Sequence, residues 1–79
     1  MITVYSANWC AFCHATMQYL DKLGVKYEKR DVEQDVAAAQ ESVKKSGQMG
    51  IPVTDIDGTI IVGFNRPAID HILKEKKLI

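Results

Sequence analysis

The chain is 79 residues long, 47% hydrophobic and 25% charged, with ten basic residues balancing ten acidic ones. This length and composition fit one domain over residues 1–79 and exclude wholesale disorder. Two cysteines are too few for a disulfide scaffold. Zero net charge gives no electrostatic basis for nucleic-acid or membrane binding, and no apolar run approaches the ~20 residues of a membrane span. We therefore expect neither nucleic-acid nor membrane partners.

The first half of the chain alternates between extended and helical patterns. Residues 1–5 are β-branched and aromatic, which predicts a strand without the basic flank of a signal peptide. From Cys10 the apolar residues recur at helical spacing: Cys13, Met17, Leu20 and Leu23. They predict a helix that Gly24 ends. Val25–Val32 alternates, which predicts a second strand.

A second helix is predicted over Gln34–Ser46, where Gly47 follows as its end. Its expected inward stripe is Val36, Ala39, Gln40 and Val43. Two extended runs then flank Asp57-Gly58, the residue pair that suits a type I′ hairpin turn. These runs predict strands over Val53–Ile56 and Thr59–Val62.

The last predicted helix begins after Asn65, which can cap it, and carries Pro67 in its first turn. Its expected buried residues are Ile69, Ile72 and Leu73. The complete order is β-α-β-α-β-β-α. The fold class is therefore α/β, with a four-stranded mixed sheet flanked by three helices and a parallel first strand pair.

The two cysteines form the motif Cys10-Ala11-Phe12-Cys13 between a predicted strand and a predicted helix. A cysteine at a helix start gains stabilisation of its thiolate from unpaired N–H groups, and Cys13 lies one turn further on. We expect Cys10 to be the more exposed of the two. In this arrangement Cys10 attacks a disulfide and Cys13 resolves the mixed disulfide, so the site predicts redox chemistry.

Several segments resemble the glutaredoxin family of the thioredoxin-like fold. Tyr5–Cys13 is similar to the active-site segment of that family, and Ser46–Val53 to its second signature, which carries a cis-proline. Asp57-Gly58 and Gly63–Asn65 match the family's hairpin and the loop before its last helix. The resemblance covers essentially the whole chain and agrees with the predicted order of elements.

The resemblance implies a role for each matching residue. Cys10 is then the nucleophile and Cys13 the resolving thiol. Pro52 is cis, so that the backbone of Ile51 is free to pair with a substrate peptide like one more strand. Phe12 lines the apolar side of the groove.

Further binding residues follow from the same resemblance. Backbone N–H groups of Gly63, Phe64 and Asn65 suit the γ-glutamyl carboxylate of glutathione. Many family members hold the glycyl carboxylate with a lysine and an arginine, where this chain has Ala7 and Gln48. In this chain, Gln48 or backbone groups would then bind the glycyl carboxylate. We expect Trp9, which precedes the nucleophile, to form a partly exposed wall of the site.

The implied protein is a monomeric, cytoplasmic thiol–disulfide oxidoreductase that acts on disulfide-containing or glutathionylated proteins. Glutathione is its co-substrate, and no cofactor or metal is tightly bound. One alternative comes from Gly63–Pro67, which resembles redoxins that thioredoxin reductase recharges and that reduce ribonucleotide reductase. Two further alternatives rest on the cysteines alone: an iron–sulfur or other metal module, and a c-type haem attachment through Cys10-x-x-Cys13-His14.

Overall fold

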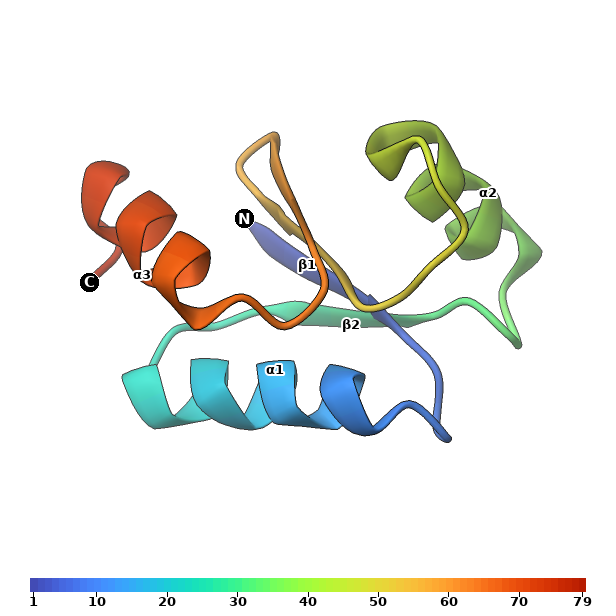
Figure 1. The fold of residues 1–79 in the computed structure, drawn as a ribbon, viewed down its shortest axis with the longest axis horizontal. Helices are drawn as coiled ribbons and strands as arrows, with labels where there is room; N and C mark the ends of the chain where they lie inside the picture. The colour runs from blue at the N-terminus through green and yellow to red at the C-terminus, as the bar shows by residue number, and fades with distance from the viewer.

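A computed structural model describes all 79 residues, and its elements follow the predicted order. They are β1 (Ile2–Ser6), α1 (Ala11–Leu23), β2 (Glu28–Asp31), α2 (Val36–Ser46), β3 (Val53–Ile56), β4 (Thr59–Val62) and α3 (Arg66–Glu75) (Figure 1). The strands form one mixed sheet in the order β2-β1-β3-β4. β1 pairs in parallel with β2 and antiparallel with β3, which is antiparallel to β4. The predicted fold class is therefore confirmed.

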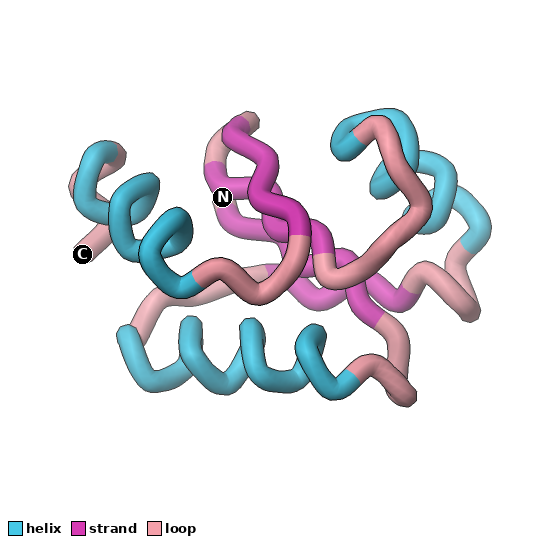
Figure 2. The backbone as a smooth tube through the Cα atoms, in the orientation of Figure 1, coloured by secondary structure: helices cyan, strands magenta, loops and turns pink.

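Helices cover both faces of the sheet (Figures 1 and 2). α1 and α3 share the larger core, in which Leu20, Ile69 and Leu73 pack against Val4 and Ile56 of the sheet. α2 covers the other face over a smaller apolar cluster: Tyr5, Ala38 and Val53. Because the larger core also contains both cysteines, the packing that holds α1 on the sheet fixes the position of the redox pair as well.

Local chain geometry follows the predicted turn and cap residues. Asp57 and Gly58 have positive φ angles of 49° and 95°, as a type I′ turn requires. Asn65 caps α3, because its side chain accepts a hydrogen bond of 3.2 Å from the N–H of Ala68. None of the three helices has the length and hydropathy that crossing a bilayer requires.

The second strand is shorter than predicted. The sequence predicts a strand over Val25–Val32, whereas β2 contains only Glu28–Asp31. β2 pairs with β1 only from Thr3 to Ser6, so the ladder begins at Glu28 and leaves Val25–Tyr27 outside it. Val25 and Tyr27 instead pack against the larger core from outside the strand, which explains their apolar character.

The predicted inward stripe of α2 was wrong. Val36 is 70% exposed and Val43 is 40% exposed, whereas Ala38 and Ser42 are the buried residues of this helix. The buried and exposed sets lie on opposite sides of the helix, because residues three, four and seven apart share one side. At about 100° per residue, the buried pair is centred about 130° from the two valines, so α2 is turned by roughly a third of a revolution from the predicted orientation.

A polar network explains this orientation of α2. Arg30 of β2 forms an ion pair with Glu41, and the Tyr5 hydroxyl donates to Glu41 at 3.2 Å. Lys45 donates to Asp55 of β3 at 2.6 Å. The Arg30 and Lys45 cations lie 5.9 and 5.8 Å from the centre of the Tyr5 ring. The sheet face under α2 thus carries charged side chains. The side of α2 that bears Glu41 and Lys45 is turned toward them.

Candidate active site

The two cysteines lie where β1 leads into α1. The chain turns after Ser6, and Cys10 becomes the N-cap of α1, one residue before the helix itself begins at Ala11. The Cys10 N–H donates to the carbonyl of Ala7 at 3.1 Å, which closes the turn. The N–H of Cys13 donates to Cys10 Sγ at 3.1 Å. Cys10 Sγ therefore occupies the position in which a helix start stabilises negative charge.

Cys10 and Cys13 are joined by a disulfide, with their Cα atoms 5.2 Å apart. Cys10 retains 5% exposure and Cys13 none, so the predicted order of exposure is confirmed. An incoming thiol can reach the bond only from the Cys10 side, whereas Cys13 is enclosed by the core. This asymmetry suits an attacking thiol at Cys10 and a resolving thiol at Cys13.

The loop before β3 completes one wall of the site. The peptide bond between Ile51 and Pro52 is cis, as the resemblance implies. Ile51 packs against the core cluster that contains both cysteines. The Pro52 carbonyl accepts the Gly63 N–H at 2.9 Å, which ties this loop to the end of β4. Ile51 and the two cysteines, which are distant in the sequence, therefore belong to one packed cluster.

The loop before α3 reaches the same core. Phe64 packs against the cluster containing the cysteines, and its ring meets Tyr19 of α1 edge-on at 6.2 Å. The Gly63 N–H is already bonded to Pro52, so the backbone N–H groups of Phe64 and Asn65 are those left without a protein partner. These two groups lie at the start of α3, where an anion is stabilised.

Trp9 and Phe12 are the two large apolar side chains next to the nucleophile, and they are 69% and 67% exposed. Trp9 lies in the turn before Cys10, and Phe12 in the first turn of α1. Neither belongs to a core cluster. Together with the recessed sulfur of Cys10, they give the surface around the disulfide an apolar character.

Gln48 closes its own loop in this structure. Its amide nitrogen donates to Ser46 Oγ at 3.1 Å and to the Gly50 carbonyl at 2.9 Å, and its amide oxygen accepts the Gly50 N–H. The carboxylate contact expected for Gln48 therefore has to compete with these bonds. Ala7, the position at which many family members carry lysine, is 1% exposed. The guanidinium carbon of Arg66 lies 4.7 Å from the centre of the Tyr19 ring.

His14 joins the site through a contact that was not predicted. Its Nε2 lies 2.8 Å from the carbonyl oxygen of Asn8, and the nitrogen donates because the carbonyl can only accept. The bond links the first turn of α1 to the loop that carries Trp9. The only sequence signal for it was the position of His14 directly after Cys13.

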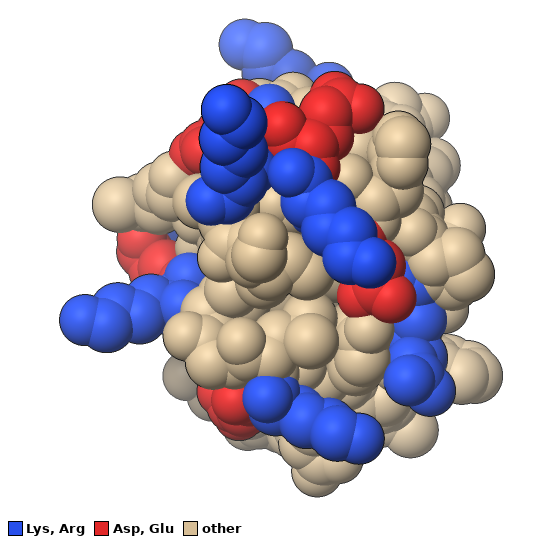
Figure 3. Space-filling view, turned by 90° about the vertical axis from the view of Figure 1, so that its left-hand side faces the viewer, with Lys and Arg blue, Asp and Glu red and all other residues tan.

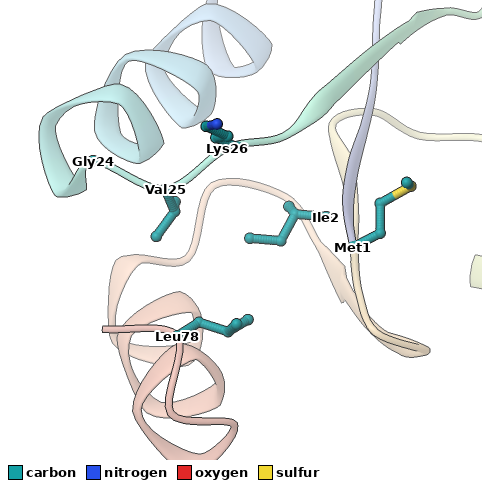
Figure 4. Close-up of a pocket in the computed structure, with 6 residues that line it drawn as sticks. All are labelled: Met1, Ile2, Gly24, Val25, Lys26 and Leu78. Atoms are coloured by element: carbon teal, nitrogen blue, oxygen red, sulfur yellow. The ribbon is translucent and has the colours of Figure 1, made fainter.

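One surface crevice lies away from the disulfide, at the opposite end of α1. A hollow of about 310 Å³ is lined there by Met1, Ile2, Gly24, Val25, Lys26 and Leu78. The side chains of Ile2, Val25 and Leu78 point into the same space (Figure 4). Basic and acidic side chains surround a mainly uncharged centre on the face where α1 and α3 end (Figure 3). This crevice has no thiol and no part in the redox site.

Groups of three or more metal-binding side chains that could hold an ion do not occur in the structure.

Comparison with known proteins agrees with this geometry. The glutaredoxin family model matches residues 2–61. An uncharacterized glutaredoxin-like 8.6 kDa protein in the rubredoxin operon of Clostridium pasteurianum is 37% identical, over 95% of this chain and 100% of its own. The thioredoxin-like protein BC3987 superposes with a TM-score of 0.87 at 29% identity, covering 92% and 100% of the two chains. The glutaredoxin-like NrdH-redoxin of Escherichia coli superposes with a TM-score of 0.76 at 30% identity. The match covers 89% of this chain and 91% of that redoxin.

Proposed function

Since the chain belongs to the glutaredoxin family, we propose that it is a thiol–disulfide oxidoreductase that reduces protein disulfides and protein–glutathione mixed disulfides. One observation carries the proposal: Cys10 caps α1, its Sγ accepts the Cys13 N–H, and it is the only residue of the pair with any exposed surface. A thiolate at that position is stabilised before it meets a substrate. Its partner lies within bonding distance, as the disulfide demonstrates.

The reaction consists of two sulfur exchanges. The Cys10 thiolate attacks one sulfur of the substrate disulfide, the substrate S–S bond breaks, and the departing thiolate takes up a proton. The Cys13 thiolate then attacks Cys10 Sγ in the mixed disulfide and releases the second substrate thiol. Two electrons pass to the substrate, and the protein is left with the Cys10–Cys13 disulfide described above.

The loops around the disulfide supply the contacts for the substrate. The cis bond before Pro52 supports the proposal that the Ile51 backbone pairs with an extended peptide. The N–H groups of Phe64 and Asn65 are available for a carboxylate at the start of α3. Trp9 and Phe12 offer exposed apolar surface on the helix side. These groups position the target sulfur in front of Cys10.

Glutathione is the proposed reductant, with the γ-glutamyl carboxylate at the start of α3. A second candidate is direct reduction by thioredoxin reductase, and one observation favours it. The two positions at which many family members carry a lysine and an arginine hold uncharged residues here, Ala7 and Gln48, and Gln48 is bonded within its own loop. Similarity to an E. coli redoxin described by its thioredoxin-like activity profile also supports this candidate. Either reductant suits a reducing compartment such as the cytoplasm.

A coupled assay that follows NADPH oxidation tests both parts of the proposal. The substrate is a glutathionylated protein, offered once with glutathione and glutathione reductase and once with thioredoxin reductase alone. Turnover in only one arm identifies the reductant. Absence of turnover in both arms contradicts the proposed function.

Two serine variants test the assigned roles of the cysteines. Cys10→Ser should lose all turnover, because no attacking sulfur remains at the surface. Cys13→Ser should retain activity only on glutathione mixed disulfides, which a second glutathione molecule can resolve. Equal loss in both variants on every substrate would contradict the division of roles between the two sulfurs.

A further inference from the structure

Tyr19 of α1 is the side chain on which the start of α3 and the loop before it converge. Its hydroxyl donates to Asp70 Oδ1, and its ring meets the Phe64 ring edge-on, with the ring centres 6.2 Å apart. The guanidinium carbon of Arg66 lies 4.7 Å from the centre of the same ring. Three contacts of one residue thus join α1 to the loop before α3 and to the first half of that helix.

The three contacts of Tyr19 all depend on orientation. A hydroxyl that donates to a carboxylate forms a strong hydrogen bond, and this bond is the main cause of the raised pKa of Tyr19. Edge-on ring pairs and cations near ring faces are also attractive only in particular geometries. The apolar packing of α3 on the core is non-directional by comparison. The contacts of Tyr19 therefore set where α3 and its preceding loop sit along α1.

The segment held in this way carries the N–H groups of Phe64 and Asn65, the pair proposed above for a substrate carboxylate. On one side of this pair, the Gly63 N–H is bonded to the loop that contains the cis-proline. On the other side, the contacts of Tyr19 fix the first turns of α3. Donors aimed at an anion contribute most when they are held in place before the anion arrives. Tyr19 supplies one of the two attachments that hold them.

We propose that Tyr19 is a positioning residue for this pair of N–H groups, and so determines how strongly the protein prefers a disulfide that carries a carboxylate over an otherwise identical neutral one. In this role Tyr19 acts through Phe64 and Asp70 rather than on the reacting atoms, since it lies six residues, or about 9 Å along α1, beyond Cys13. The inference rests on the proposed thiol–disulfide exchange and names a residue that sets its selectivity.

A single-turnover reaction with two glutathione derivatives tests the inference. Both are mixed disulfides of glutathione with 4-thiopyridine, and in one of them the γ-glutamyl carboxylate is replaced by a carboxamide. The Cys10 thiolate attacks the glutathione sulfur and breaks the disulfide. The departing 4-thiopyridine takes up a proton and is recorded by stopped-flow absorbance. The Cys13 thiolate then displaces glutathione, so that two electrons pass from the reduced protein to the substrate.

The measured quantity is the ratio of the rate constants for the carboxylate and carboxamide substrates. We expect a ratio of about ten for the unmodified protein, which is the effect of one hydrogen bond to a charged group. Tyr19→Leu removes the hydroxyl and the aromatic ring, and should bring the ratio close to one. Tyr19→Phe keeps the ring and loses only the hydroxyl, so its ratio should lie between those of the other two proteins.

Tyr27→Leu is the matched control for loss of a tyrosine. Tyr27 is also half-buried and packs against the same core cluster, but it lines a hollow beside Met1 and Ile2. This variant should keep the ratio of the unmodified protein. An equal fall of the ratio in Tyr27→Leu and Tyr19→Leu would mean that general loosening of the core causes the effect, and would overturn the inference.

Reaction with 4,4′-dithiodipyridine separates selectivity from the reactivity of the sulfur. This neutral disulfide has no carboxylate, so its rate should be similar in all four proteins. A ratio near one in the unmodified protein, or an unchanged ratio in the Tyr19 variants, overturns the inference and leaves the proposed function intact. If Tyr19→Leu does not fold, the ratio in Tyr19→Phe decides. Failure of the unmodified reduced protein to react with any of the three disulfides refutes the proposed function, and the inference falls with it.

Discussion

Replacing Asp55 with asparagine should reveal how strongly the polar network holds α2. Asp55 is 9% exposed, accepts from Lys45 Nζ at 2.6 Å, and accepts the Gly58 N–H at 2.8 Å through its other oxygen. Asparagine keeps the shape and can keep the bond to Gly58. The variant therefore removes one charged hydrogen bond and leaves Lys45 without its nearest anion.

Hydrogen bonds to charged groups contribute about 1.5–3 kcal/mol. Lys45 remains more than a third exposed, so water recovers part of this loss. We expect Asp55→Asn to lower the free energy of unfolding at pH 7 by about 1–2 kcal/mol. For a domain of this size, each kcal/mol corresponds to a fall of about 4–8 °C in Tm.

The effect should depend on pH in one direction. Burial raises the pKa of Asp55, but the hydrogen bonds from Lys45 and Gly58 lower it more, so its pKa in the folded protein lies below the usual 3.8. A carboxyl with a lowered folded pKa stabilises the protein fully above its unfolded pKa, and this contribution is lost as the pH falls through the folded value. The difference between Asp55→Asn and the unmodified protein should therefore be largest above about pH 5 and shrink below pH 4.

Urea unfolding followed by circular dichroism at pH 7 and pH 3 measures this difference. Asp57→Asn is the matched control, because Asp57 lies two residues away in the hairpin and pairs only with the exposed N-terminal ammonium. An exposed pair contributes about 0–1 kcal/mol, so the control should change stability little. An Asp55→Asn protein as stable as the unmodified one, or a difference of the same size at both pH values, refutes the reasoning.

Three further variants test contacts around the site. His14→Ala removes the hydrogen bond to the Asn8 carbonyl. Amide hydrogen exchange in the loop before Cys10, measured by NMR, should therefore become faster. An unchanged exchange rate would mean that the contact does not order the loop. Asn65→Ala removes the cap of α3 and should cost about 1 kcal/mol in urea unfolding, whereas a neutral result would exclude a capping role. Tyr19→Phe removes the hydroxyl bond to Asp70 between α1 and α3 and should cost about 0.5–1.5 kcal/mol; equal stability would contradict the contact.

Much of the fold could be predicted because its signals are local. Asp57-Gly58 and Asn65 act through the φ angles and hydrogen bonds of their immediate neighbours, so sequence alone places the hairpin and the start of α3 correctly. The redox pair is equally local, since two cysteines three residues apart at a helix start share one face wherever that helix packs.

The orientation of α2 could not be predicted in this way. A helix with valines on one side and Glu41 and Lys45 on the other is ordinarily expected to bury its valines. The opposite arrangement depends on Arg30 and Asp55, which reach the same sheet face only after β2 and β3 have paired with β1. Periodicity within one helix contains no information about charges on distant strands.

The ligand contact of Gln48, in the loop between α2 and β3, stays a prediction. Gln48 was assigned a ligand contact from its place before Pro52, yet its amide bonds Ser46 and Gly50 in this structure. Ser46 in turn donates to the Ser42 carbonyl inside α2, so the loop conformation is tied to the end of that helix. Side-chain roles in such a loop follow from where the helix stops and how it is turned.

The orientation of α2 and the conformation of the loop that follows it have one physical origin. Because ion pairs hold α2 on the sheet, its valines are free to face outward, and the loop anchored to its last turn places Met49 and Ile51 beside them. The sulfur chemistry depends on the start of α1, on the opposite side of the sheet. Substitutions on the outward side of α2 should therefore leave the reactivity of Cys10 unchanged.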